Sequence, residues 1–226
     1  MRLGLLGGSF NPIHRCHLSI AQSAQQLLHL DRVLFIPTGD PPHKQPATLA
    51  SAHHRYTMVQ LAIQDQPAFA LTDIEIRRSG KSYSIDTIRA LQQEYGPDTN
   101  LFFIIGLDAF LDLPSWKEAD LLLKSCHFVV ISRPSTTFLA VASIPLFHEV
   151  PKDILIALDA AQQERAEVPL QRGRALTFLR LPPCEVSASD IRTRLRNGRP
   201  LANLLPPLVE SYILREGLYM EDSERF

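Results

Sequence analysis

The sequence predicts an α/β fold in which an open parallel sheet has helices on both faces. Short apolar segments flanked by Gly, Pro, Asp or charged residues are typical of buried strands. They cover residues 3–6, 32–36, 101–105, 128–131 and 176–181. Segments with helical spacing alternate with them, at 18–30, 54–64, 84–95, 117–124 and 153–165. This alternation predicts repeated β–α–β units, which place parallel strands between layers of helices.

The C-terminal part of the chain predicts two further helices. They cover residues 187–197 and 207–216, with Gly198 and Gly217 as their C-terminal stops. We expect a single domain, in which a Rossmann-like core of residues 1–184 carries residues 185–226 as a small helical appendage packed back on the sheet. In residues 134–174, Thr, Ser and Pro turns surround one helical segment, and we expect boundary errors there.

Composition narrows the class of protein. The 226 residues suffice for a full hydrophobic core, and 45% hydrophobic with 21% charged residues is typical of a globular enzyme domain. A formal net charge of −1 provides no global basic field for nucleic acid or anionic lipid. We therefore expect small-molecule substrates and neither a nucleic-acid nor a membrane partner, while a homo-oligomer is left open.

The N-terminus and the cysteines predict the compartment. The N-terminal apolar run is too short for a signal peptide, and no stretch approaches the ~20 apolar residues of a membrane span. Cys16, Cys126 and Cys184 are odd in number, far apart and free of C-x-x-C spacing. This pattern argues against a disulfide framework and a zinc site, and it favours a soluble, unprocessed protein in a reducing cytoplasm.

The segment GGSFNPIHRCH, residues 7–17, follows the first predicted strand and opens the first helix. Gly7 and Gly8 let the backbone approach a phosphate, and a helix N-terminus offers free N–H groups. His14 and His17 are three residues apart, so they share one helical face and can both reach phosphate oxygens. The alternatives are a plain tight turn with a half-exposed histidine pair, or a metal site that lacks a third ligand nearby.

The segment SASDIR, residues 187–192, precedes a predicted helix and provides a second phosphate-binding pattern. Ser187 with Asp190 three residues later is by itself an ordinary capping box. Together with the first motif, the hydroxyls of Ser187 and Ser189, the helix N-terminus and Arg192 become a second clamp for the same triphosphate.

These motifs carry a family resemblance. The first resembles the G-G-[ST]-F-[DN]-P-x-H-x-G-H signature of the nucleotidyltransferase superfamily, with Cys16 in place of the usual Gly, and the second resembles its I-S-S-T-x-I-R signature. Further segments resemble the bacterial nicotinate-nucleotide adenylyltransferases: PPHK at 41–44, SYS at 82–84, IIGLD at 104–108 followed by Trp116, and EGLY at 216–219. The resemblance covers nearly the whole chain except residues 134–174.

The resemblance implies transfer of AMP from ATP to nicotinate mononucleotide in NAD biosynthesis, with Mg²⁺ held mainly by ATP and water and no dedicated protein metal site. The implied catalytic residues are His14, His17, Lys44 and Arg192. The implied ATP-binding residues are Gly7, Gly8, Ser9, Phe10, His17, Gly106, Asp108, Arg133, Ser187, Ser189 and Arg192. The implied acceptor-binding residues are Asn11, Lys44, Tyr83, Ser84 and Trp116.

Several of these residues have a plainer interpretation. Trp116 offers a flat face to a cationic pyridinium ring but also suits a packing anchor. Asp108 suits a ribose hydroxyl or a helix N-cap. Arg133 can stack on adenine, and Lys44 can bind phosphate, but either can be a solvated charge. Tyr83 and Ser84, at a helix start, offer donors to a carboxylate.

Other functions remain open from the sequence. A related transferase with nicotinamide mononucleotide or phosphopantetheine as acceptor is the nearest, although the phosphopantetheine enzymes are shorter and should lack the Trp116 and SYS features. A catalytically silent nucleotide-binding regulator is supported only by Cys16. An RNA-binding module would need a basic surface that the net charge of −1 does not suggest.

Overall fold

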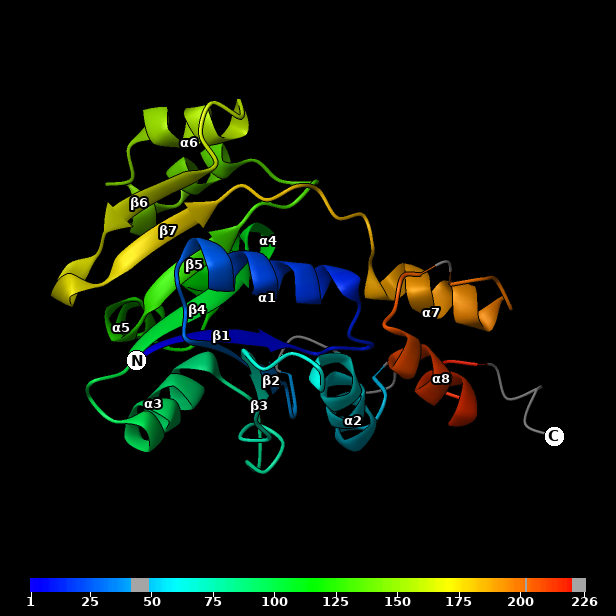
Figure 1. The fold of residues 1–226 in the computed structure, drawn as a ribbon. Coiled ribbons are helices and arrows are strands. Elements are labelled where there is room, and N and C mark those ends of the chain that lie inside the picture. The colour runs from blue at the N-terminus through cyan, green and yellow to red at the C-terminus, as the bar shows by residue number, and fades with distance from the viewer. Residues whose placement is uncertain (42–48, 202, 221–226) are drawn as a thin grey trace. The chain divides into compact units, whose positions relative to one another are not determined.

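The computed structural model describes residues 1–41, 49–201 and 203–220. Its seven-stranded sheet has the order β3-β2-β1-β4-β5-β7-β6 (Figure 1). The strands are β1 (Arg2–Gly8), β2 (Arg32–Pro37), β3 (Phe69–Leu71), β4 (Asn100–Gly106), β5 (His127–Ile131), β6 (Arg165–Pro169) and β7 (Ala175–Leu179). β1, β4, β5 and β7 pair in parallel, and β6 pairs antiparallel to β7. The expected open α/β sheet is confirmed, with one antiparallel edge strand.

The seven expected helices are present, within a few residues of their predicted bounds except for α6. The α-helices are α1 (Arg15–Leu27), α2 (Ala52–Ile63), α3 (Ser84–Tyr95), α4 (Leu107–Leu111), α5 (Ala119–Ser125), α6 (Lys152–Asp159), α7 (Ala188–Arg196) and α8 (Pro207–Arg215). Short 3₁₀ turns include η2 (Leu113–Ser115), η3 (Phe138–Ser143) and η4 (Pro145–Phe147). Gly198 and Gly217 have φ of 59° and 62°, which is the left-handed conformation expected at their helix ends.

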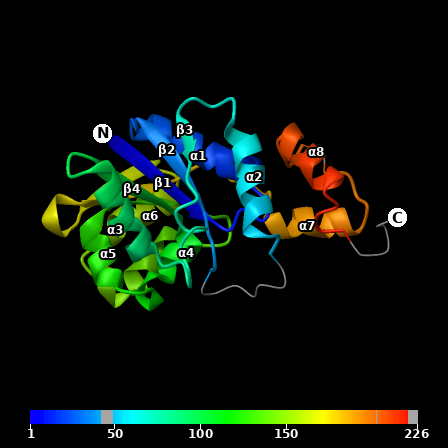
Figure 2. The ribbon, with the colours of Figure 1, turned by 90° about the horizontal axis from the view of Figure 1, so that it is seen from below.

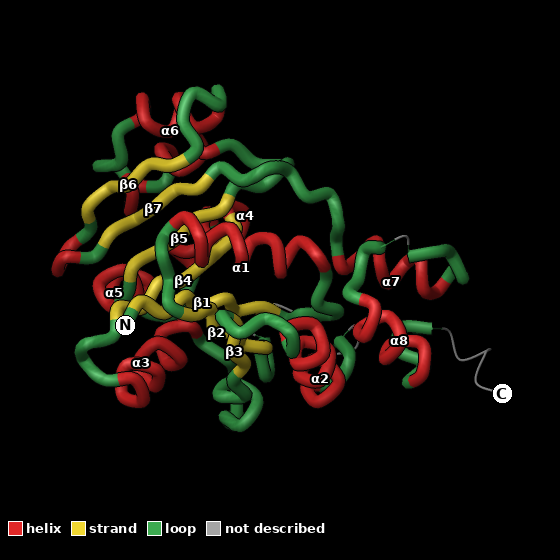
Figure 3. The backbone as a smooth tube through the Cα atoms, in the orientation of Figure 1, coloured by secondary structure: helices red, strands yellow, loops and turns green. Residues whose placement is uncertain are grey.

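The largest differences from the sequence prediction concern β3, β6 and α6. The helix predicted over 153–165 ends at Asp159, and residues 165–169 form β6 instead (Figure 3). Only Ala166 and Val168 of β6 are buried, so this edge strand lacks the continuous apolar run of the central strands. β3 has three half-buried residues, too few for a period to show.

The contacts between Cα atoms divide the chain into two compact units. Unit 1 comprises Met1–Leu6, Ser23–Val33 and Tyr83–Cys184, and unit 2 comprises Gly7–Gln22, Leu34–Ser82 and Glu185–Phe226. The expected separation into residues 1–184 and 185–226 as core and appendage stays a prediction. No helix in the described part of the chain has the length and apolar character needed to cross a membrane.

The core of unit 1 is built from aromatic side chains on strands and short helices. Phe110 of α4 stacks on Phe147 at 4.5 Å between ring centroids and meets Phe178 of β7 edge-on at 6.3 Å. Each such ring contributes about 1.5–3 kcal/mol through burial alone.

A polar contact also connects two helices of unit 1. On α3, the Gln92 side chain donates to the Ser125 carbonyl over 2.8 Å, which ties α3 to α5.

Unit 2 has its own apolar cluster and its own helix pair. The ring of Phe35 in β2 lies 5.9 Å from Phe10 and 5.3 Å from Phe69. α8 packs against α2, where the Tyr212 hydroxyl and His54 Nδ1 are 2.8 Å apart, and both views show these helices side by side (Figure 2).

One expectation about the cysteines is wrong. Cys16 and Cys184 are disulfide-bonded, and Cys126 is the free cysteine of the described residues. Linear spacing detects only local pairs of the C-x-x-C kind, so it could not exclude this. Burial raises the pKa of the Cys126 thiol to about 12, which keeps it protonated and unreactive.

Candidate active site

The N-terminal loop, defined as residues 7–14 of unit 2, comprises the end of β1 and the connection to α1. A Cβ on Gly8 would lie 3.2 Å from the Phe10 ring, which is a tight contact, so glycine eases the close approach of this ring. A Cβ on Gly7 would meet no heavy atom of the described residues within 4 Å, so the backbone there is open to a ligand. Phe10 is 1% exposed and has a φ of 44°. Phe10 therefore anchors the loop from the protein interior.

His14 and His17 lie together at the start of α1. The His14 backbone N–H donates to His17 Nδ1 over 3.2 Å, and the two ring centroids are 3.8 Å apart. Because Nδ1 of His17 accepts this bond, the neutral ring carries its proton on Nε2. His14 is only 5% exposed, so the interpretation of a half-exposed pair is wrong for this residue. The pair can present an oriented N–H donor to an anionic oxygen.

The second motif also lies in unit 2, where it forms the start of α7. The Ser187 hydroxyl accepts from the Asp190 backbone N–H over 3.1 Å, so Ser187 is the N-cap of α7. The Asp190 carboxylate pairs with Arg194 over 2.8 Å. The plain capping interpretation of Ser187 is confirmed, and its contact with phosphate stays a prediction.

Arg192 connects the second motif to the N-terminal loop. Its Nη1 donates to the Asn11 carbonyl over 2.7 Å, and its Nη2 donates to the Ser189 hydroxyl over 3.4 Å. Arg192 thereby links Asn11 and Ser189, which are two other predicted site residues.

Arg55 of α2 is a residue of the site that sequence reasoning missed. It is 1% exposed, and it donates to the carbonyls of Ala50, Ser9 and Gly39 over 3.0, 2.9 and 3.2 Å. Burial lowers the pKa of its guanidinium, while Tyr219 and Glu75 act in the opposite direction. A signal was available: Arg55 lies on the same face as the apolar Met58, Val59 and Ile63, where a charge indicates a buried polar role.

In unit 1, the end of β4 brings three predicted ATP-binding residues together. Gly106 is the N-cap of α4, so the interpretation of Asp108 as the N-cap is wrong. Asp108 instead pairs with Arg133 over 3.3 Å, and Arg133 is therefore not a simple solvated charge. A Cβ on Gly106 would lie 2.5 Å from the Asp108 carboxylate and 2.6 Å from the Arg133 guanidinium. A Cβ at position 106 would therefore force these two side chains to shift from the observed ion pair.

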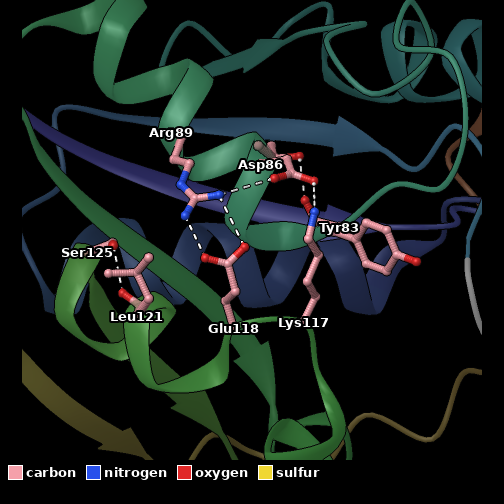
Figure 4. A network of polar contacts seen from close by, with 8 residues as sticks. Tyr83, Asp86, Arg89, Lys117, Glu118, Leu121 and Ser125 are labelled. Atoms are coloured by element: carbon pink, nitrogen blue, oxygen red, sulfur yellow. Dashed lines mark hydrogen bonds and ion pairs between the residues drawn. The ribbon is translucent and has the colours of Figure 1, made fainter.

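The predicted acceptor residues of unit 1 lie at the start of α3 and beside η2. Tyr83 is the N-cap of α3, and Ser84 is its first residue. The Lys117 ammonium lies 4.8 Å from the centre of the Tyr83 ring and 3.0 Å from the Asp86 carboxylate (Figure 4). Lys117 follows Trp116 directly, so it ties the tryptophan segment to the start of α3.

A second ion pair reinforces this connection. Arg89 of α3 bonds the Glu118 carboxylate over 2.6 Å (Figure 4). Trp116 is half-buried and meets Phe103 edge-on at 6.2 Å, which fits a packing anchor and leaves its role as a ring platform a prediction. A surface groove beside it is lined by residues that include Leu121 and Ile144.

The structure thus groups the predicted residues within each unit. Unit 2 holds His14, His17, Asn11, Ser189 and Arg192, whereas unit 1 holds Gly106, Asp108 and Arg133 in one group and Tyr83, Ser84 and Trp116 in another. Lys44 lies outside the described residues.

Comparison with known proteins identifies the family from the sequence. The model of the cytidylyltransferase-like family matches residues 5–194. Relatives described as probable nicotinate-nucleotide adenylyltransferases include one from Geotalea daltonii, 44% identical over 97% of this chain and 98% of its own. Another, from Moorella thermoacetica, is 36% identical over 96% of this chain and 91% of its own.

Solved structures share the fold. The Plasmodium falciparum nicotinic acid mononucleotide adenylyltransferase complexed with NaAD superposes with a TM-score of 0.71 at 20% identity, over 96% of this chain and 97% of that chain. The extent of the family match and the identity to full-length relatives show that the chain belongs to the cytidylyltransferase-like family, within its nicotinate-nucleotide adenylyltransferases.

Proposed function

We propose that this chain is an enzyme that transfers the adenylyl group of ATP to nicotinate mononucleotide, giving nicotinate adenine dinucleotide and pyrophosphate for NAD synthesis. The observation that carries the proposal is the N-terminal loop, in which His17 is oriented by the His14 backbone and Arg192 bonds the Asn11 carbonyl. These are the residues of the two family signatures. The names of the relatives supply the acceptor.

The reaction requires no protein nucleophile. A phosphate oxygen of the acceptor attacks the α-phosphorus of ATP, the bond from this phosphorus to the bridging oxygen breaks, and pyrophosphate leaves with the electron pair. Because the attacking oxygen is already anionic, a general base is dispensable, and the rate depends on alignment and on neutralising charge.

Charge neutralisation is assigned to His14, His17, Lys44 and Arg192. The Nε2–H of His17 donates to a phosphate oxygen, a role that its accepting Nδ1 permits. The acceptor is held by Asn11, Lys44, Tyr83, Ser84 and Trp116. The remaining signature residues, with Gly106, Asp108 and Arg133, bind the nucleotide of ATP.

Mg²⁺ enters with ATP as part of the substrate. Mg²⁺ prefers oxygen ligands and usually keeps several waters, so triphosphate oxygens and water are the ligands that we assign to the ion. Bound there, the ion supplies charge neutralisation for the leaving pyrophosphate. A cytoplasmic location belongs to the same proposal and awaits its own test.

Pyrophosphate release from ATP and Mg²⁺ tests the function directly. Nicotinate mononucleotide, nicotinamide mononucleotide and phosphopantetheine are offered separately as acceptors. We expect the highest kcat/KM with nicotinate mononucleotide. Preference for either of the others would move the acceptor assignment, and no release with any of the three would favour a nucleotide-binding regulator.

A further inference from the structure

Tyr219, near the C-terminus, bonds a residue of the N-terminal loop. Its hydroxyl donates to the Asn11 side-chain oxygen over 2.8 Å. Both residues belong to unit 2, although 208 positions separate them in the chain. The signature residues account for the loop and for α7, but neither signature includes Tyr219.

The hydrogen bonds at Asn11 fix its side chain as well as its backbone. The side-chain oxygen accepts from Tyr219 and from the Ala50 backbone N–H over 3.0 Å, while the Asn11 carbonyl accepts from Arg192. Two donors on one amide oxygen determine which branch of the amide is oxygen and which is nitrogen. Asn11 is 3% exposed, so little solvent competes for these bonds.

Tyr219 is suited to act as a permanent donor. Burial raises the pKa of its phenol, and the nearby Arg192 and Arg55 only partly offset this, so the hydroxyl stays protonated at neutral pH. Its backbone has a φ of 66°, a left-handed conformation that costs a non-glycine residue free energy. A bulky residue held in this conformation indicates that the surrounding contacts determine its position.

We propose that Tyr219 is a positioning residue of the acceptor site, which holds the Asn11 amide in one orientation and thereby fixes the N-terminal loop. Without the phenol, the Asn11 oxygen loses one of the two donors described above and keeps the Ala50 N–H, so one restraint on the orientation of the amide is lost. The inference rests on the proposed function, because Asn11 is assigned there to the acceptor mononucleotide.

Tyr219→Phe tests the proposal, since it removes only the hydroxyl. We expect it to raise KM for nicotinate mononucleotide by about three- to tenfold, as the loss of one hydrogen bond would. KM for ATP should rise by less, because the phenol directly bonds a residue assigned to the acceptor. In an Asn11→Ala background, Tyr219→Phe should have no further effect on this KM, because the group that it positions is gone.

Tyr212→Phe is the matched control. Tyr212 is another tyrosine of unit 2 whose hydroxyl meets His54 at 2.8 Å, in the α2–α8 packing. It should lower the melting temperature without changing either KM. An unchanged acceptor KM in Tyr219→Phe, a similar rise in Tyr212→Phe, or an additive double variant would overturn the proposal.

A measurement without turnover separates this inference from the proposed function. Amide hydrogen exchange should be faster in the peptide covering residues 8–14 of Tyr219→Phe than in wild type or Tyr212→Phe. If the wild-type enzyme uses no nicotinate mononucleotide, the proposed function fails, and these exchange rates decide alone whether Tyr219 fixes the loop. Equal rates in all three proteins would refute it.

Discussion

One backbone hydrogen bond, from the His14 N–H to His17 Nδ1, leaves Nε2 as the nitrogen that carries the proton of the neutral His17 ring. Replacing His17 by Ala removes that donor and the edge contact of its ring with Phe10, whose other ring contact, with Phe35, remains. We expect kcat to fall by about 10²–10³, which is typical for the loss of one group that stabilises transition-state charge. Steady-state pyrophosphate release measures the effect.

His53→Ala supplies the comparison for this variant. His53 lies on α2 in the same unit and is exposed, so its loss should leave kcat and the melting temperature nearly unchanged. If His17→Ala keeps near-normal turnover, His17 has no catalytic role, whatever its orientation.

Some contacts of individual site residues could not be predicted from the sequence. The signatures singled out His14, His17, Asn11 and Arg192, because the spacing within each signature is local; their roles stay predictions. Spacing does not reveal that the Arg192 guanidinium bonds a backbone carbonyl 181 positions away, since this depends on how the chain returns to the loop. The contact of Tyr219 with Asn11 is equally long-range, and the sequence, in which Tyr219 belongs to the EGLY segment, assigned no role to it.

At the level of elements, Arg55 joins α2 to three backbone segments through the carbonyls of Ser9, Gly39 and Ala50. Arg55→Met keeps much of the side-chain volume but leaves three carbonyls without this donor. We expect the free energy of unfolding to fall by about 2–5 kcal/mol, because unsatisfied buried polar groups are costly. Urea unfolding measures the loss.

A surface arginine provides the control for this change. Arg77 pairs with Asp73 over 2.9 Å, but its side chain is 73% exposed. Arg77→Met should therefore change stability little, because exposed ion pairs contribute little. Equal effects of the two substitutions would show that Arg55 does not stabilise these segments.

His127, the first residue of β5, makes the stability of its strand depend on pH. Its ring stacks on Phe102 at 4.6 Å, and its Nδ1 accepts from the Ala175 N–H of β7 over 3.1 Å. Burial is the main cause that lowers the pKa of His127; Arg174 and Arg2 lower it further, and Glu167 opposes them. Below about pH 6.5 the unfolded chain therefore binds more protons than the folded one, and stability is lost as the pH falls.

His127→Gln removes this titration and keeps a side-chain acceptor. We expect the melting temperature to fall less in the variant than in wild type between about pH 7.5 and about pH 5, because one source of acid destabilisation is absent. Thermal unfolding followed by circular dichroism measures both proteins. An equal fall would assign the acid sensitivity to carboxylates elsewhere.

The helices and strands differ in how far the local residue pattern of the sequence predicts them. The central strands β4 and β5 are buried along almost their whole length, so continuous apolar runs predicted them to within one residue at each end. β6 is an edge strand with alternating burial, and it begins at the last residue of the helix predicted over 153–165. Its pairing with β7 depends on tertiary contacts, which the pattern of a few neighbouring residues in the sequence does not reveal.

For the whole molecule, a product that binds only the folded state must raise its stability by mass action. Nicotinate adenine dinucleotide at about 100 times its Kd should stabilise the protein by about 2.7 kcal/mol, which for this size raises the melting temperature by roughly 5–10 °C. Nicotinamide adenine dinucleotide at the same concentration should raise it less, because the amide lacks the carboxylate assigned to Tyr83 and Ser84. Equal shifts would remove that assignment while keeping the fold, and the absence of any shift would count against the dinucleotide as product. Because this measurement needs no turnover, it separates failure to bind the product from failure to catalyse its formation.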